Sequence, residues 1–211
     1  MKNTPHPAKF TKALEPYLQA NGLVLDPFAG TGRIGKMVAG TAVGVELERE
    51  WAIQGREYNT RMVIGNSILL PFKDNTFDAI VTSPAYGNRM ADRHDAKDGS
   101  LRRSYRHLLG RNLTFGNTGG MHWCDKYRRT HMLAYAECVR VLKRGGMFVL
   151  NISDHIRKGR RVPVSDWHTQ TLIDLGLTYL SNLDIETPRM RFVANRKRAE
   201  REHVRRFSKP I

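Results

Sequence analysis

Hydrophobic and polar positions follow two alternating patterns along the chain. Short apolar runs that end at polar or small residues predict buried strands at residues 23–25, 42–45, 62–64, 77–81, 147–150 and 177–183. Apolar residues recur at helical intervals within residues 47–58, 132–142 and 166–175, and a further helix is expected to begin near Gly32. Strands separated by helices predict an α/β fold with a mainly parallel sheet and helices on both faces.

A chain of 211 residues is long enough for one α/β core, so we expect residues 1–211 to form a single domain. Two regions of this domain interrupt the alternation of strands and helices. Residues 87–130 are rich in Arg, His and Gly and form too long a connection to be structural alone, which predicts a functional insertion. The tail at residues 189–211 is basic, and its clusters at 196–198 and 205–206 predict either a helix with one basic face or an unstructured phosphate-binding tail.

The charge balance indicates a polyanionic partner. The chain carries 35 Lys and Arg against 20 Asp and Glu, a formal net charge of +15, which favours nucleic acid. Two cysteines are too few for a disulfide framework and favour a reducing, cytoplasmic setting. The chain has no apolar run of the roughly 18 residues that a membrane span needs, so we expect no membrane partner.

A cofactor loop is predicted where the first strand ends, at residues 26–32, Asp-Pro-Phe-Ala-Gly-Thr-Gly. Small residues there allow a ligand to approach the backbone, although a structural turn also needs glycine. Glu46 ends the second predicted strand and can accept hydrogen bonds from both hydroxyls of a ribose. Because Asp26 is acidic, the loop suits S-adenosylmethionine, which carries an ammonium group and no phosphate, better than a dinucleotide.

A second motif, Thr82-Ser83-Pro84-Ala85-Tyr86, follows the fourth predicted strand, at the sheet edge where such folds place their chemistry. The exocyclic amino group of a nucleic-acid base has little available lone pair, so a catalyst must accept its protons and orient it. The Ser83 hydroxyl and the Pro84 carbonyl can accept them, and Tyr86 offers a flat face for an extruded base.

These two motifs resemble those of the amino-group DNA methyltransferases, which use S-adenosylmethionine. The resemblance implies a Rossmann-like class I methyltransferase fold with a seven-stranded sheet. It implies cofactor contacts at Lys9, Asp26, Pro27, Phe28, Ala29, Gly30, Thr31, Gly32, Glu46, Leu47, Asn66 and Ser67. It implies catalytic roles for Ser83, Pro84, Ala85 and Tyr86. Ala85 departs from the family motif, which has a second proline here, and the departure removes a restraint on Pro84.

The function implied is direct methyl transfer to the exocyclic amino group of a flipped base in DNA. Ser83 favours N4 of cytosine over N6 of adenine, in a prokaryotic or phage-encoded protein of the restriction-modification type. Two alternatives remain: an RNA methyltransferase acting on adenine N6 or guanine N2, and a non-catalytic nucleic-acid-binding protein on the same scaffold.

Cations and aromatic residues alternate in the insertion, as a surface for phosphates and unstacked bases requires. The aromatic residues are Tyr105, Phe115, Trp123 and Tyr127, which could instead pack on the core. The predicted nucleic-acid contacts are Arg89, Arg102, Arg103, Arg106, Arg128, Arg129, Arg157, Lys158, Arg160 and Arg161, and the insertion also contains Arg93 and Arg111.

His122, Cys124, His131 and Cys138 are the residues that could bind zinc. Their spacing matches no established ligand pattern, so we expect no metal. Neither cysteine lies in the Pro-Cys turn used for carbon-5 methylation.

Overall fold

A computed structural model describes residue 6 and residues 12–87, 105–157, 160–186 and 201–211. Several predicted site residues lie outside these ranges: Lys9, Arg89, Arg93, Arg102, Arg103 and Lys158.

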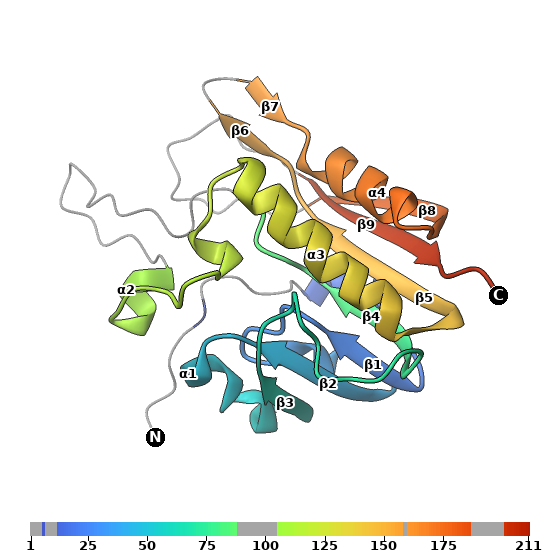
Figure 1. Cartoon of the computed structure of the whole chain (residues 1–211), viewed down its shortest axis with the longest axis horizontal. Coiled ribbons are helices and arrows are strands. Elements are labelled where there is room, and N and C mark those ends of the chain that lie inside the picture. Colours follow the sequence, from blue (N-terminus) through green and yellow to red (C-terminus); the bar gives the residue numbers. More distant parts are fainter. Residues whose placement is uncertain (1–5, 7–11, 88–104, 158–159, 187–200) are drawn as a thin grey trace.

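The core is a seven-stranded sheet in the order β3-β2-β1-β4-β5-β9-β8 (Figure 1). Its strands are β1 Leu23–Asp26, β2 Thr41–Glu46, β3 Thr60–Ile64, β4 Phe77–Thr82, β5 Leu142–Ile152, β8 Thr178–Glu186 and β9 Arg201–Ser208. The first five strands pair in parallel, and β9 is antiparallel to both of its neighbours. A separate hairpin joins β6 His155–Arg157 to β7 Arg160–Val162. The predicted Rossmann-like α/β sheet is confirmed.

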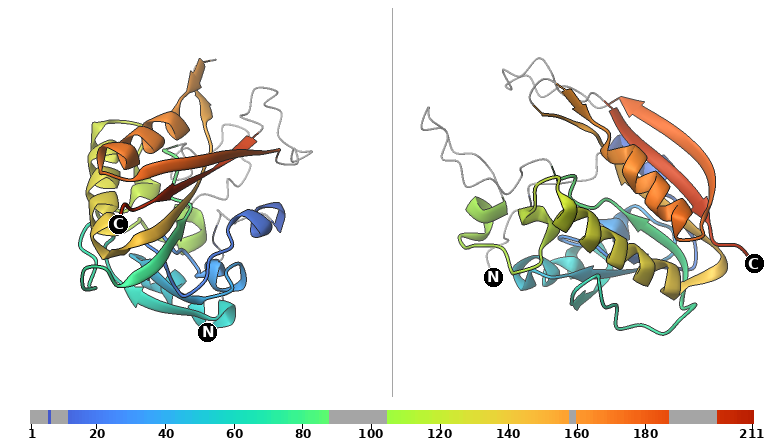
Figure 2. Two further views of the ribbon diagram at one scale, coloured as in Figure 1. Left: turned by 90° about the vertical axis from the view of Figure 1, so that its right-hand side faces the viewer. Right: turned by 45° about the horizontal axis from the view of Figure 1, so that its top comes forward.

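Helices cover both faces of the sheet. The α-helices are α1 Arg49–Ala52, α2 Tyr105–Leu109, α3 Asp125–Val141 and α4 Val164–Asp174, and the 3-10 turns are η1 Lys12–Tyr17, η2 Arg33–Lys36, η3 Gly55–Tyr58 and η4 Thr118–Gly120. Figure 1 shows α3 and α4 side by side over one face, and the left view of Figure 2 shows η1, in blue, on the other side. The α3 helix begins before residue 132, so it takes up the end of the predicted insertion.

Side-chain alternation along the strands divides the core in two. Leu25, Ile80 and Phe148 pack with α3 and α4, whereas their neighbours Val24 and Val149 pack with η1 and η2 on the opposite face. Successive strand residues point to opposite faces, and here both faces are buried, which explains why the predicted strands read as continuous apolar runs.

The helix predicted over residues 47–58 is wrong, because α1 and η3 replace it. Gly55 interrupts the helix, and a Cβ atom built on Gly55 would lie only 2.0 Å from Cγ of Met62. Asn59 then ends η3 in a left-handed conformation with φ of 58°. The close approach of Gly55 to β3 is a tertiary constraint that helical spacing does not reveal.

The tail prediction is also wrong for residues 201–208. They form neither a helix nor an unstructured tail but strand β9, which lies between β5 and β8 inside the sheet. Val204 and Phe207 are buried, and these apolar positions outweigh the basic residues between them. Residues 196–198 lie outside the described ranges.

Replacing Phe207 with alanine is expected to lower the free energy of unfolding by about 3–5 kcal/mol, because the ring is fully buried between Phe148 and Tyr179. Phe115→Ala is the matched control, since that ring is 88% exposed and its loss should change stability by less than about 0.5 kcal/mol. Urea unfolding followed by circular dichroism measures both. Equal stability of the two variants would contradict the placement of β9 in the core.

Candidate functional site

Asp26 joins the predicted cofactor loop to the strand that precedes the predicted catalytic turn. Its Oδ1 accepts a hydrogen bond from the Phe28 N–H at 3.0 Å and another from the Thr82 hydroxyl at 2.7 Å. Burial raises the pKa of Asp26 to about 6, while the two hydrogen bonds act against this rise. Asp26 therefore sets the relative position of the ends of β1 and β4.

Glu46 occupies the end of β2 and closes over the same loop. Its Oε2 accepts from the Gly30 N–H and its Oε1 from the Glu48 N–H, both at 2.8 Å. Burial raises the pKa of Glu46 to about 8, and the charge of Glu48 adds to the rise. Gly30 has φ of 53°, and a Cβ there would meet the ring of His6 at 3.1 Å, so this position requires glycine.

A cavity of about 640 Å³, including its open mouth, lies at this carboxyl edge of the sheet. It is lined by residues of both predicted motifs: Pro27, Phe28, Glu46, Leu47, Asn66 and Ser67 from the cofactor set, and Ser83 and Ala85 from the catalytic set. The other predicted cofactor residues with described positions, Asp26, Ala29, Gly30, Thr31 and Gly32, are buried behind this lining. The Ser67 hydroxyl donates to the Pro27 carbonyl and fixes the loop.

Asn66 presents a donor to the cavity. Its Oδ1 accepts from the Ile68 N–H at 3.2 Å, which leaves its Nδ2 facing Gly116. The resemblance assigns Asn66 to the cofactor, and an amide donor at this position suits a ring nitrogen of adenine.

The catalytic turn is braced from the sheet. The Ser83 hydroxyl lies 2.9 Å from the Tyr86 hydroxyl, and the amide of Asn151 on β5 lies 3.3 Å from both. The same amide donates to Glu202 on β9 at 2.6 Å. Burial and the charge of Glu202 hold the pKa of Tyr86 above its ordinary value, so Tyr86 is a neutral phenol at physiological pH. Tyr86 and Pro84 are not on the cavity wall, and the base-stacking role of Tyr86 stays a prediction.

A buried hydrogen-bond chain holds the turn at Ala85. The Tyr127 hydroxyl donates to the Ala85 carbonyl at 2.5 Å and lies 2.9 Å from Nε2 of His168, whose Nδ1 lies 2.6 Å from the Tyr135 hydroxyl. Burial holds the pKa of His168 well below its ordinary value, so the ring is neutral. One tautomer satisfies every bond: Nε2 donates to Tyr127, and Nδ1 accepts from Tyr135. The chain restrains the turn where the family motif has a second proline.

Glu48 fixes the segment that forms the opposite wall. Its carboxylate accepts from Thr114 N–H, Asn117 Nδ2 and Arg111, all within 2.8 Å, and from the Thr114 hydroxyl at 3.0 Å. Arg111 also pairs with Glu50. The next residues along, 116–119, line the cavity. Arg111 is exposed but paired with two carboxylates, which oppose the role in phosphate binding that its place in the insertion suggested.

The predicted cationic surface divides into paired and exposed residues. Arg128 pairs with Asp125, and its guanidinium lies 5.6 Å from the centre of the Trp123 ring. Arg106, Arg129 and Arg160 are exposed and form no salt bridge with another described residue. Arg157 belongs to β6.

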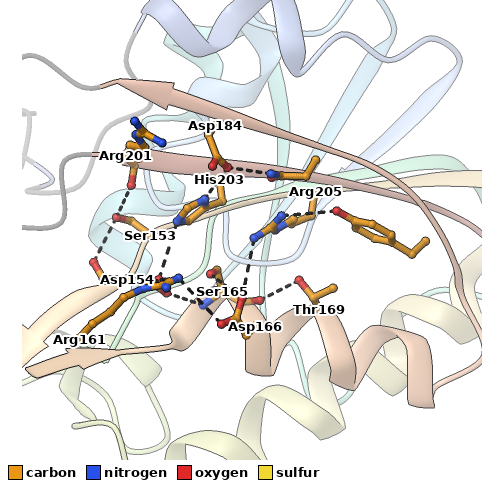
Figure 3. Close-up of polar contacts among 12 residues, drawn as sticks. Ser153, Asp154, Arg161, Ser165, Asp166, Thr169, Asp184, Arg201, His203 and Arg205 are labelled. Atoms are coloured by element: carbon orange, nitrogen blue, oxygen red, sulfur yellow. Dashed lines mark hydrogen bonds and ion pairs between the residues drawn. The ribbon is translucent and has the colours of Figure 1, made fainter.

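Arg161 takes part in a network around Asp154 (Figure 3). Its Nε donates to Asp154 at 2.5 Å, and the Ser165 N–H at the start of α4 donates to the same carboxylate at 2.8 Å. His203 of β9 bonds to Asp184 at 2.7 Å beside them. Arg161 thus links the β6–β7 hairpin to α4. Its side chain is also half-exposed to solvent.

Several residues of the site were not predicted from the sequence. His6 and Trp51, whose ring centres lie 4.4 Å apart, form an aromatic wall of the cavity with Tyr105, an aromatic residue of the insertion that the sequence did indicate. Asn151, His168 and Glu202 brace the catalytic turn from β5, α4 and β9. These residues lie far in sequence from the two motifs, and no local sequence pattern indicates contacts of this kind.

Within the described ranges, no cluster of three or more His, Cys, Asp or Glu residues could hold a metal ion. The helices in those ranges are all too short or too polar to cross a membrane.

No protein-family model matches the sequence, and no curated protein matches it. Solved structures do match the fold. A S-adenosylmethionine-dependent methyltransferase from Methanosarcina mazei aligns with a TM-score of 0.58 over 97% of this chain and 100% of its own, at 13% identity. A TehB-like methyltransferase from Corynebacterium glutamicum aligns with a TM-score of 0.52 over 94% and 85% of the two chains, at 15% identity. The [4+2]-cyclase SpnF aligns with a TM-score of 0.56 over 94% and 79%, at 14% identity. This chain therefore has the fold of S-adenosylmethionine-dependent methyltransferases.

Proposed function

We propose that this protein transfers a methyl group from S-adenosylmethionine to the exocyclic amino group of a base in DNA. One observation carries the proposal: a single cavity is lined both by the loop after β1, with Glu46, and by the turn after β4, with Ser83. Open α/β sheets bind ligands at this edge. The cofactor and the amino group can meet there without any rearrangement of the core.

The lining fits the cofactor. Its ionisable side chains among the described residues are Glu46, His6 and Tyr105, so the wall offers no Lys or Arg for a phosphate. Glu46 can accept bonds from ribose hydroxyls with its remaining lone pairs, and Asn66 can donate to the adenine ring. S-adenosylmethionine, when bound, supplies an electrophilic methyl group.

The catalytic turn fits an amino acceptor. The Ser83 oxygen, which lies on the cavity wall, accepts an amino proton and so turns the nitrogen lone pair toward the methyl group. Pro84 is not on the wall, so its carbonyl can accept the second amino proton only after a small shift of the turn. Transfer would form the nitrogen–carbon bond as the sulfur–carbon bond breaks, with S-adenosylhomocysteine as the leaving group, and the proton that the nitrogen loses would pass to water at the open mouth of the cavity. Since Tyr86 stays neutral and bonds to Ser83, its role in this step is to orient the Ser83 hydroxyl.

DNA is favoured as the polymer by the +15 charge of the chain together with the family resemblance of its two motifs. Ser83 favours N4 of cytosine within that proposal.

Ser83→Ala is expected to lower kcat about 100-fold or more, because it removes one acceptor for the amino protons. Binding of S-adenosylmethionine, measured by calorimetry, should stay unchanged, since the hydroxyl contacts Tyr86 and Asn151 rather than the cofactor loop. Ser181→Ala on the exposed strand β8 serves as the control. The measurement is transfer of labelled methyl to unmethylated DNA, with nucleoside mass spectrometry of the product; a Ser83→Ala enzyme of normal rate would remove this turn from the mechanism.

Affinity for S-adenosylhomocysteine is expected to rise with pH from about 6 to about 9, because ligand hydroxyls bond best to ionised Glu46, whose pKa is about 8. The protonated acid has one acceptor fewer, so the gain is complete only above the folded pKa. Glu46→Gln should bind more weakly at high pH and lose this dependence. Calorimetry measures the affinity of both proteins at each pH. Because ionisation of the ligand itself affects both proteins equally, the difference between their affinities reports on Glu46. Parallel curves for the two proteins would refute the assignment of Glu46 to the ribose.

Tyr127→Phe is expected to lower kcat about 10- to 100-fold with little change in cofactor affinity, because it releases the Ala85 carbonyl and lets the turn shift. Ala85→Pro, which restores the proline of the family motif, should recover much of this loss in the double variant. Steady-state kinetics of the four proteins in this cycle measure the coupling. A purely additive cycle would show that Tyr127 affects kcat independently of the turn at position 85.

A further inference from the structure

One aromatic ring at the cavity rim is not packed on the core. Tyr105 and Tyr127 of the insertion are buried, which agrees with the alternative that these aromatic residues pack on the core. Phe115, in contrast, is 88% exposed. A single exposed apolar ring is common on protein surfaces, so the inference depends on what surrounds Phe115.

The segment that carries Phe115 has a fixed shape. Thr114 and Asn117 on either side of the ring are bonded to Glu48 at 2.8 Å. Gly116 turns the chain with φ of 90°, a conformation that favours glycine. The ring is therefore presented by a preorganised turn rather than by a free loop.

Phe115 lies directly beside the substrate cavity. Its neighbours Gly116 and Asn117 line the wall, and a Cβ atom built on Gly116 would lie 3.8 Å from Nδ2 of Asn66, another lining residue.

Cations flank the ring. Nζ of Lys126 lies 4.7 Å from the centre of the Phe115 ring, at the start of α3. Arg129 follows three residues later on the same side of the helix and is exposed, and Thr130 next to it lines the cavity. Along α3, two cations, Lys126 and Arg129, therefore precede Thr130, which lines the cavity. This arrangement suits a phosphate backbone that runs past the rim.

We propose, on the basis of the function proposed above, that Phe115 inserts into the base stack of double-stranded DNA as the target base leaves it, while Lys126 and Arg129 bind the adjacent phosphates. Extruding a base leaves a gap in the stack, and an inserted apolar side chain restores the lost stacking. A base in single-stranded DNA needs no such replacement.

The test compares double-stranded and heat-denatured plasmid DNA as acceptors for labelled methyl. Phe115→Ala is expected to lower the rate about tenfold on duplex DNA and less than about twofold on denatured DNA. Phe115→Trp should retain the duplex rate. Leu180→Ala, which removes another exposed apolar side chain on β8, should leave both rates unchanged.

An equal loss on both forms of DNA, or an unchanged duplex rate, would overturn the insertion of Phe115 while leaving the methyltransferase function intact. Transfer by the wild-type protein to denatured DNA alone would overturn it too, because no duplex is then opened. Absence of transfer by the wild-type protein to either form would overturn the proposed function itself.

Discussion

The shared hydrogen bonds of Asp26 are the constraint on which the whole site depends. One carboxylate oxygen accepts from Phe28 in the loop after β1 and from Thr82 at the end of β4. These strands are neighbours in the sheet, with Val24 opposite Ala79 and Leu25 opposite Ile80, so their carboxyl ends already lie together. The carboxylate converts this proximity into a fixed geometry. Its desolvation is unfavourable, and the two hydrogen bonds offset part of that cost.

The end of β2 contributes two carboxylates with different tasks. Glu46 faces inward and bonds to the loop after β1, whereas Glu48, two residues on, bonds to the segment around Thr114 that forms the far wall. Residues two apart in a strand share a face, but Glu48 lies beyond the end of β2, where the chain turns into α1, so its carboxylate can point away from that of Glu46. One short stretch can therefore position both walls. Glu48 bonds to Thr114 and Asn117 on either side of Phe115 and so connects the rim of the cavity to the end of β2.

Sequence periodicity predicted the sheet well because buried parallel strands read as apolar runs, and it placed Glu46, Ser83 and the loop after β1 at the correct edge. It failed at β9, because Val204 and Phe207 are too few to outweigh Arg205 and Arg206 in a local reading. It failed at residues 47–58, where the approach of Gly55 to Met62 is decided by tertiary packing. Asn151, His168 and Glu202 escaped prediction for the same reason: each reaches the catalytic turn only after the sheet has formed.

The net charge of +15, which the sequence gives, does not show where on the protein the positive charge is exposed. Ion pairs with carboxylates neutralise some cations locally and leave others unpaired. Arg111 and Arg140 each contact two carboxylates and are held in place by them, so their positive charge is largely cancelled locally. The excess must then reside on residues that carboxylates do not neutralise, such as Lys126 and Arg129 beside the cavity. Carboxylates that organise the fold therefore also determine which cations stay unpaired beside the cavity.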